Sequence, residues 1–379
     1  INPNESFVEL SFSTTILAGV EKIISSLLQY PYGCIEQTIS STLPNAIVKK
    51  FQDLLDVGID DATLQKNLDA GIKRFASMQT ADGGFAYWEG GTTSEPHITP
   101  YAVLALVEMR DLGVKIPREM IDKGRTFIED QVKALQGNIS DERLSQLVQE
   151  LHALSRLDSG VFGTARTLLQ NRLEKLTTHE KIVYGLSLAK KDVNNYRKEL
   201  EELIAKIDLS KAGDSDRNWY WDSTADRALY AQLLIRLNPQ HKDIPGLIKD
   251  LYALDLGSYY YSTQSKAQVF IAFAAFIEKV DSGNKGRVAL DYQLGKKKGK
   301  INLTERAIFR KLSIPMSEIQ NTGGDLKFTV SGAGGQRVYT DLLVSQIPKD
   351  PTTVKAQQDK GIKVTRQYYK LGAVKETDN

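Results

Sequence analysis

Cysteine is almost absent from this chain, and long hydrophobic runs are missing altogether. Cys34 is the only cysteine among 379 residues, which excludes an internal disulfide framework and any zinc site built from several cysteines. No apolar stretch is long enough to cross a bilayer as a helix, and no signal peptide opens the sequence. The formal net charge of only +2 gives no reason to expect nucleic acid or an anionic membrane as a partner.

What remains is the composition of an ordinary globular protein, with 41% hydrophobic and 25% charged residues. A chain of this length has room for two or three domains and a sizeable core. The first residue, Ile1, is not an initiator methionine, and the last five residues are polar or charged. We therefore expect the sequence to be a piece of a longer protein.

A helical pattern extends from about residue 14 to residue 280, with apolar residues recurring at i, i+3 and i+4. About twelve helices are predicted, at 14–30, 34–51, 60–79, 96–112, 117–136, 140–157, 160–175, 178–190, 192–208, 223–237, 243–255 and 262–280. Helices that are apolar nearly all round are expected inside, and helices with one apolar stripe are expected to cover them. Six inner and six outer helices would form an α/α toroid, although a solenoid of helical hairpins has the same helix count.

Three junctions between these helices combine a turn with a cluster of aromatic residues. They lie at 79–88, 219–224 and 257–264, and the later two include serine or threonine residues able to cap the next helix. Similar aromatic turns occur in toroids of the terpenoid-cyclase type. We expect these side chains to seal the open end of the helical barrel, and a ligand-binding role is the alternative.

Short strands flank the helical region on both sides. Residues 6–12 predict one strand, and 287–294, 300–303, 325–332 and 337–346 predict others after residue 280. Residues 295–300 indicate a turn with a solvated tip at 296–298, and the last two strands are expected to form a hairpin across a glycine-rich turn. These strands predict an antiparallel β-sandwich of about seventy residues.

The order of these patterns predicts a nested domain arrangement. Residues 1–13 and 282–350 would form the β-sandwich, and residues 14–281 would form the helical domain inserted into it. Residues 351–379 would supply a polar linker and a strand at 361–370. That strand needs another domain to pair with.

The single cysteine lies in the stretch Tyr30-Pro31-Tyr32-Gly33-Cys34-Ile35-Glu36-Gln37-Thr38. Gly33 permits a sharp backbone turn just before Cys34, and the helix at 34–51 begins there. Gln37 follows Cys34 at i+3, so the two side chains lie on the same helical face. A thiol beside a carboxamide at this spacing can lose ammonia and form an internal thioester, in a ring of about fifteen atoms that one helical turn can hold.

This stretch resembles the thioester motif of the alpha-2-macroglobulin and complement family. Animal members usually have glycine between the cysteine and the glutamate, whereas Ile35 is similar to the bulky aliphatic residue of the bacterial members. The resemblance covers nearly the whole chain. It implies a terpenoid-cyclase-like toroid nested in a CUB-like sandwich, and it makes 361–370 the first strand of a C-terminal macroglobulin-like domain.

The function that this resemblance implies is a protease trap that works once and is not an enzyme. In the family, cleavage of a bait region elsewhere in the protein uncovers the thioester. The Gln37 carbonyl would then acylate a nucleophile of the protease, such as a lysine amine. The partners implied are target proteases and other domains of the same longer chain. No cofactor or metal is implied, and the setting would be the periplasm or the bacterial cell surface.

An activated thioester must be shielded from water, and Tyr30, Tyr32 and Ile35 are candidates for part of that cover; plain core packing is the alternative for all three. Some complement proteins use a histidine on a later loop to direct transfer to hydroxyls. The corresponding region, about 136–143, holds no histidine, so we expect reaction with amines. His97 opens a helix and is a possible neighbour of the thioester.

Three other functions remain open at this stage. A toroid enzyme acting on glycans or terpenoids would need paired carboxylates or aspartate-rich metal motifs, and the sequence offers only Asp60-Asp61 at a helix start. A hydrolase with Cys34 as nucleophile would need a histidine partner and leaves Gln37 unexplained. A purely structural domain that never forms the thioester is the third.

Overall fold

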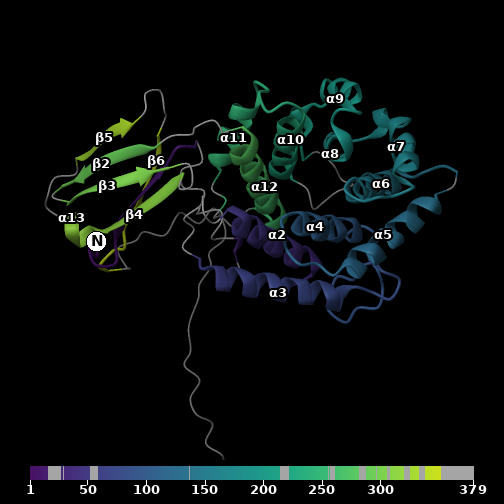
Figure 1. The fold of residues 1–379 in the computed structure, drawn as a ribbon, viewed down its shortest axis with the longest axis horizontal. Coiled ribbons are helices and arrows are strands. Elements are labelled where there is room, and N and C mark those ends of the chain that lie inside the picture. Colours follow the sequence, from purple (N-terminus) through teal and green to yellow (C-terminus); the bar gives the residue numbers. More distant parts are fainter. Residues whose placement is uncertain are drawn as a thin grey trace, which may run out of the picture.

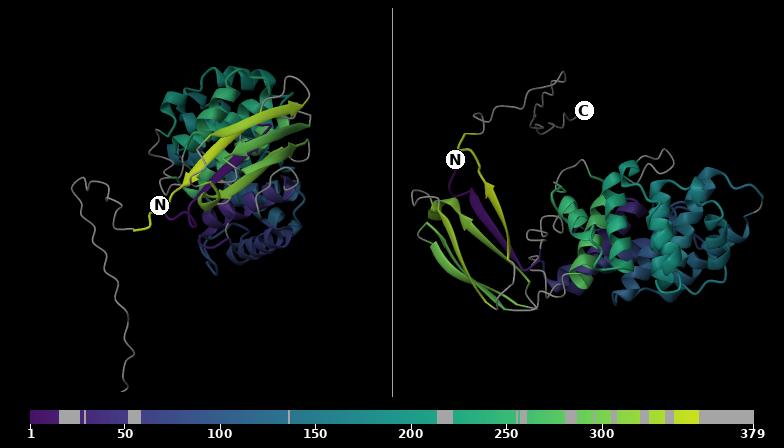
Figure 2. Two further views of the ribbon diagram at one scale, coloured as in Figure 1. Left: turned by 90° about the vertical axis from the view of Figure 1, so that its left-hand side faces the viewer. Right: turned by 90° about the horizontal axis from the view of Figure 1, so that it is seen from above.

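The computed structural model describes residues 1–15, 27–28, 30–51, 59–135, 137–213, 222–254, 256, 261–280, 287–295, 297–304, 308–319, 325–332 and 338–350. These residues form a helical domain and a β domain that lie side by side (Figures 1 and 2). Each has its own hydrophobic core. The N-terminus lies in the β domain.

Six long helices contact one another in a closed ring, which Figure 1 views face-on. They are α2 (Ile35–Phe51), α4 (Thr99–Asp111), α6 (Asp141–Leu154), α8 (Thr178–Asp192), α10 (Ser223–Leu237) and α12 (Thr263–Lys279). Each packs against the next, and α12 packs against α2, a contact that an open solenoid does not make. These helices are apolar on most sides because neighbours surround them, and α4 buries ten of its thirteen residues.

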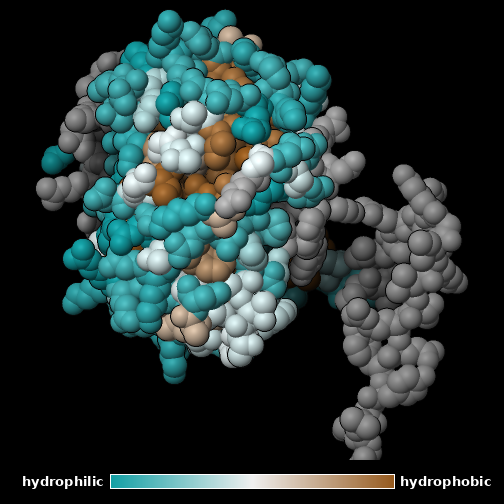
Figure 3. All heavy atoms as spheres, turned by 90° about the vertical axis from the view of Figure 1, so that its right-hand side faces the viewer, coloured by the Kyte–Doolittle hydropathy of each residue, from teal (hydrophilic) through white to brown (hydrophobic). Residues whose placement is uncertain are grey.

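Five further helices of the described chain lie around the ring. They are α3 (Asp61–Met78), α5 (Arg118–Lys133), α7 (Phe162–Gln170), α9 (Arg197–Ile204) and α11 (Ile244–Tyr252). Each has one apolar stripe; on α5 it includes Met120, Phe127 and Ile128. On the α5–α7 side, hydrophilic side chains surround a hydrophobic centre (Figure 3).

The helix predictions agree with the structure except at three places. The predicted helix at 192–208 is shorter and begins only at Arg197. The segment 160–175 is divided into α7 and a 3₁₀ turn, Leu173–Lys175, and a second 3₁₀ turn spans Leu209–Lys211. Most of the predicted first helix, 14–30, falls outside the described residues.

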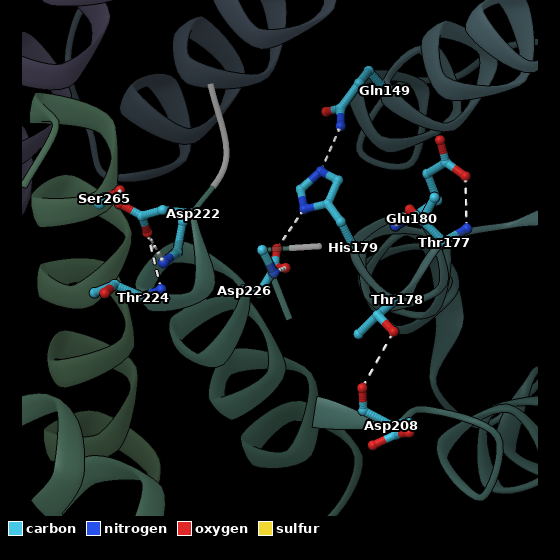
Figure 4. A network of polar contacts seen from close by, with 12 residues as sticks. Gln149, Thr177, Thr178, His179, Glu180, Asp208, Asp222, Thr224, Asp226 and Ser265 are labelled. Atoms are coloured by element: carbon cyan, nitrogen blue, oxygen red, sulfur yellow. Dashed lines mark hydrogen bonds and ion pairs between the residues drawn. The ribbon is translucent and has the colours of Figure 1, made fainter. Parts of the chain in front are cut away.

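The inner helices run parallel, so their N-terminal turns gather at one end of the ring. Figure 4 shows part of the polar network there. His179 of α8 lies between Asp226 of α10, at 2.6 Å, and Gln149 of α6, at 3.2 Å. Asp222 caps α10 and accepts a hydrogen bond from Ser265 of α12 at 2.7 Å. Each contact joins neighbouring inner helices, so the network ties this end of the ring together.

The C-terminal turns of the inner helices surround a cavity of about 490 Å³ at the other end. Glu108 of α4 and Lys190 of α8 form an ion pair beside it, and Asp111 pairs with Arg156 at 2.5 Å. Burial lowers the pKa of the Lys190 amine, and the nearby Glu108 carboxylate opposes that shift.

In the part of the chain that the structure describes, the β domain has two three-stranded antiparallel sheets. In one, β1 (Phe7–Ser13) lies between β4 (Phe309–Pro315) and β6 (Tyr339–Ser345); in the other, β2 (Val288–Leu294) lies between β3 (Lys297–Leu303) and β5 (Leu326–Gly332). A short helix, α13 (Met316–Ile319), follows β4. Phe12 of β1 meets Phe328 of β5 edge-to-face at 5.3 Å, so the sheets pack against each other.

The strand predictions need three corrections. The last two strands do not form a hairpin, because β5 pairs with β2 and β6 pairs with β1 in the other sheet. The returning strand begins at Lys297, so Lys297 and Lys298 are paired strand residues and not part of a loop tip. Strand β4 was not predicted, because its core-facing residues are interrupted by Arg310 and Lys311.

Candidate functional site

Cys34 lies at the N-terminus of α2 and directly precedes Ile35, the first residue of that helix. Gly33 before it has φ of +95°, a conformation that other residues rarely adopt. The Ile35 N–H donates to the carbonyl of Tyr87 at 2.9 Å, and the Thr38 N–H donates to the Cys34 carbonyl at 2.9 Å. The half-buried Cys34 is therefore fixed between a tight turn and the first turn of a helix.

The side chain of Gln37 folds back over this turn. Its Oε1 accepts a hydrogen bond from the Cys34 backbone N–H at 3.1 Å. A Cβ atom on residue 33 would lie only 1.8 Å from the same Oε1 and 2.7 Å from Cδ. Only glycine at position 33 leaves room for the Gln37 carboxamide to approach Cys34.

Arg74 of α3 also holds this turn, a role that was not predicted from the sequence. Its guanidinium donates to the Gly33 carbonyl at 2.5 Å and to the Thr38 hydroxyl at 3.3 Å, and it pairs with Glu89 at 3.2 Å. Helix α3 can come this close because Gly71, one turn earlier, packs against Thr42 of α2.

Aromatic side chains lie at the surface around Cys34. Tyr30 and Tyr32 pack against each other with ring centroids 4.3 Å apart, and they are 39% and 71% exposed. Core packing, the alternative considered for these residues, is therefore wrong for both tyrosines. It is right for Ile35, which is fully buried.

The aromatic turn at 79–88 also reaches the site, because Tyr87 binds the Ile35 N–H. Within this turn, Phe85 is buried and packs edge-to-face on Phe75, as a sealing role requires. Trp88 is 62% exposed and seals nothing in the described structure. Of the aromatic residues in the other two turns, Tyr261 alone lies in the described part of the chain.

Glu36 faces the next inner helix and not the solvent side of the turn. Its carboxylate accepts hydrogen bonds from the Thr263 hydroxyl of α12, at 3.1 Å, and from the Ser40 hydroxyl, at 2.7 Å. Burial raises the pKa of the Glu36 carboxyl, and these two hydrogen bonds oppose the shift. Ser40 also lies 3.5 Å from the hydroxyl of Tyr101, a buried residue of α4.

No described histidine makes a hydrogen bond to Cys34. His97 is exposed just before α4, and no polar group of the described residues is paired with its ring. His152 is buried in the last turn of α6, where burial lowers its pKa well below the usual range. His179 is held by Asp226 and Gln149 (Figure 4).

No group of three or more histidine, cysteine, aspartate or glutamate side chains in the described ranges is placed to hold a metal ion. No described helix combines the length and the apolar character needed to cross a membrane.

Comparison with known proteins agrees with this architecture. Residues 7–147 match the family model of the A-macroglobulin TED domain. The chain is 24% identical over 386 residues to an alpha-2-macroglobulin of Rickettsia conorii, covering 97% of this chain and 19% of that protein. It is 26% identical over 270 residues to the alpha-2-macroglobulin of Escherichia coli, covering 67% of this chain and 16% of that protein.

A solved structure shows the same fold over most of the chain. The crystal structure of Salmonella alpha-2-macroglobulin reacted with methylamine aligns with a TM-score of 0.67 and 23% identity, over 92% of this chain and 22% of that one. The chain thus spans about a fifth of the length of the curated relatives that it matches over most of its own residues. Residues 7–147 thus match the A-macroglobulin TED domain family, and most of the chain is similar in sequence and in fold to bacterial alpha-2-macroglobulins.

Proposed function

We propose that Cys34 and Gln37 form an internal thioester, and that this chain is the reactive part of a protease-trapping inhibitor. The observation that carries the proposal is the Gln37 carboxamide folded over Gly33, with its oxygen 3.1 Å from the Cys34 backbone nitrogen. The family match supports it. So does the Salmonella relative, whose structure is described as reacted with methylamine, a small amine.

The chemistry balances with these two side chains alone. The Cys34 sulfur attacks Cδ of Gln37, a C–S bond forms, the C–N bond breaks, and the nitrogen leaves as ammonia with the thiol proton. An attacking amine later forms a new C–N bond at Cδ and expels the thiolate, which takes up the proton that the amine loses. The helix N-terminus stabilises negative charge on the sulfur by up to ~1 kcal/mol. The site is consumed in this reaction, so it works once.

In the longer protein we propose that cleavage of a bait region exposes this site to a lysine amine of the attacking protease. Before cleavage the thioester needs cover from water, and the exposed Tyr30, Tyr32 and Trp88 suit an apolar contact with another domain of that chain. The periplasm or the bacterial cell surface is the proposed location, after the bacterial relatives.

We also propose the identity of each domain from the resemblance to the alpha-2-macroglobulin family. The helical domain, 14–281, would be a terpenoid-cyclase-like α/α toroid with six inner and six outer helices. The β domain, 1–13 and 282–350, would be CUB-like. Residues 351–379 would lead into a macroglobulin-like domain. The closed inner ring and the pairing of β1 with β4 and β6 support this nesting.

Intact mass and thiol titration test the proposal. The unmodified chain should be lighter than its sequence mass by one ammonia and should have no titratable thiol. Methylamine should then add its own mass and release one thiol. A Cys34→Ala variant should show neither change. If the thiol titrates fully before methylamine is added, the thioester is absent, and the alternative of a purely structural domain is correct.

A further inference from the structure

We propose that the Cys34 backbone N–H is the oxyanion donor of the thioester reaction and that Arg74 is the residue that positions and polarises it. This inference rests on the proposed thioester. The observations that carry it are the two hydrogen bonds of one peptide group, which joins Gly33 to Cys34. Its carbonyl accepts from Arg74 at 2.5 Å, and its N–H donates to Gln37 Oε1 at 3.1 Å.

The oxygen of the Gln37 carboxamide stands for the carbonyl oxygen of the thioester. When a nucleophile adds to Cδ, this oxygen becomes negatively charged in the tetrahedral intermediate. A hydrogen-bond donor already placed on it stabilises that charge, and loss of one such donor from an enzyme site slows the reaction by about 10²–10³. The same oxygen carries the charge in ring closure and in ring opening, so one donor serves both steps.

Among the described residues, the Cys34 N–H has no other acceptor than Gln37, and the next backbone donor along the chain is already occupied. The Ile35 N–H donates to Tyr87, and the Thr38 N–H is used inside the helix. Gly33, with its positive φ and no Cβ, turns the peptide so that the Cys34 N–H points at the carboxamide. The helix N-terminus adds a favourable potential for the negative oxygen.

Arg74 acts on this oxygen through the peptide and not by contact. A cation that donates to a peptide carbonyl draws electron density toward the oxygen, and hydrogen bonds in such a chain strengthen one another. Arg74 is suited to the task because its fork also binds the Thr38 hydroxyl and Glu89, which fixes the guanidinium. Its side chain is only 17% exposed, so water screens the interaction little.

Four chains test this inference: the unmodified protein, Arg74→Met, Arg74→Lys and Arg172→Met. Arg172 is a matched control, because it also donates to a backbone carbonyl, that of Leu168 at 3.1 Å, far along the chain from Cys34. Each chain is examined for the fraction that carries the thioester, for the rate constant of opening by methylamine, and for thermal stability. The rate constant refers to molecules that carry the thioester, so a smaller fraction of such molecules does not change it, and the thermal stability shows whether a variant is folded.

We expect Arg74→Met to slow opening by about tenfold, less than the effect of losing a direct donor, because Arg74 acts through the peptide. Arg74→Lys should recover part of the rate, since an ammonium can still donate to the Gly33 carbonyl. Arg172→Met should react like the unmodified chain. An Arg74→Met chain of normal thermal stability that forms no thioester would also support the inference.

Two results would overturn it, and they differ from each other. Equal rate constants in the unmodified chain and both Arg74 variants would remove the role of Arg74 while the thioester stands. A thiol that titrates fully in the unmodified chain would remove the thioester and this inference together.

Discussion

Gly33→Ala isolates the feature on which the site depends. The substitution places a methyl group 1.8 Å from Gln37 Oε1 and 2.7 Å from Cδ, so the carboxamide must leave its position over the turn. An alanine at φ of +95° also costs roughly 1–2 kcal/mol in backbone strain. We expect moderate destabilisation together with loss of thioester formation.

Gly113→Ala separates the two causes. Gly113 has φ of +94°, and no atom lies within 4 Å of the position that its Cβ would occupy. This variant should suffer the same backbone strain and still form the thioester. The measurements are thermal unfolding and the amount of thiol released by methylamine. Normal thiol release from Gly33→Ala would refute the geometry, because it would mean that Gln37 reaches Cys34 without the space above Gly33.

Three further outcomes are expected. Burial raises the pKa of Glu150 to about 7. As the pH rises, the folded state therefore keeps this proton after the unfolded chain has lost it. The free energy of unfolding should fall by up to ~3 kcal/mol between pH 4.5 and 7 and then level off. Glu150→Gln should flatten that fall in urea titrations, and an unchanged fall would contradict the assignment. Gly71→Ala would put a methyl group 2.2 Å from Thr42 Oγ1, so we expect it to separate α3 from α2 at a cost of roughly 1–3 kcal/mol; a stability equal to the unmodified chain would show that the helices can yield. Methylamine should open the thioester much faster than glycerol, and comparable rates would point to a histidine that the sequence does not reveal.

The sequence predicted the parts of the site that are close together along the chain. Gly33, Cys34 and Gln37 lie within one helical turn, so their relation follows from helix geometry and the conformational freedom of glycine. Arg74 lies forty positions after Cys34, and only the packing of α3 on α2 brings it to the turn. An arginine on a polar helix face gives no sequence signal of its own.

The same limit explains the fold. Most helices were predicted correctly because their apolar period is a local pattern. The ends of α9 were not predicted correctly, because exposed polar residues such as Arg197, Lys198 and Glu201 do not show where the helix begins. Which strands share a sheet is a long-range choice. The pattern of β5 and β6 fits a hairpin as well as it fits two sheets, and the partners β1 and β2 decide between them.

The position of β1 has a consequence for how the protein folds. Ser13 pairs with Phe309, and Phe7 pairs with Ser345, so the β domain must join segments about three hundred residues apart. Closing a flexible loop of that length costs about 5 kcal/mol of chain entropy. Once α12 has docked on α2, the two ends of the helical region are held together and most of that cost is already met. We expect the helical ring to fold first. Substitutions that destabilise the ring should therefore also destabilise the β domain.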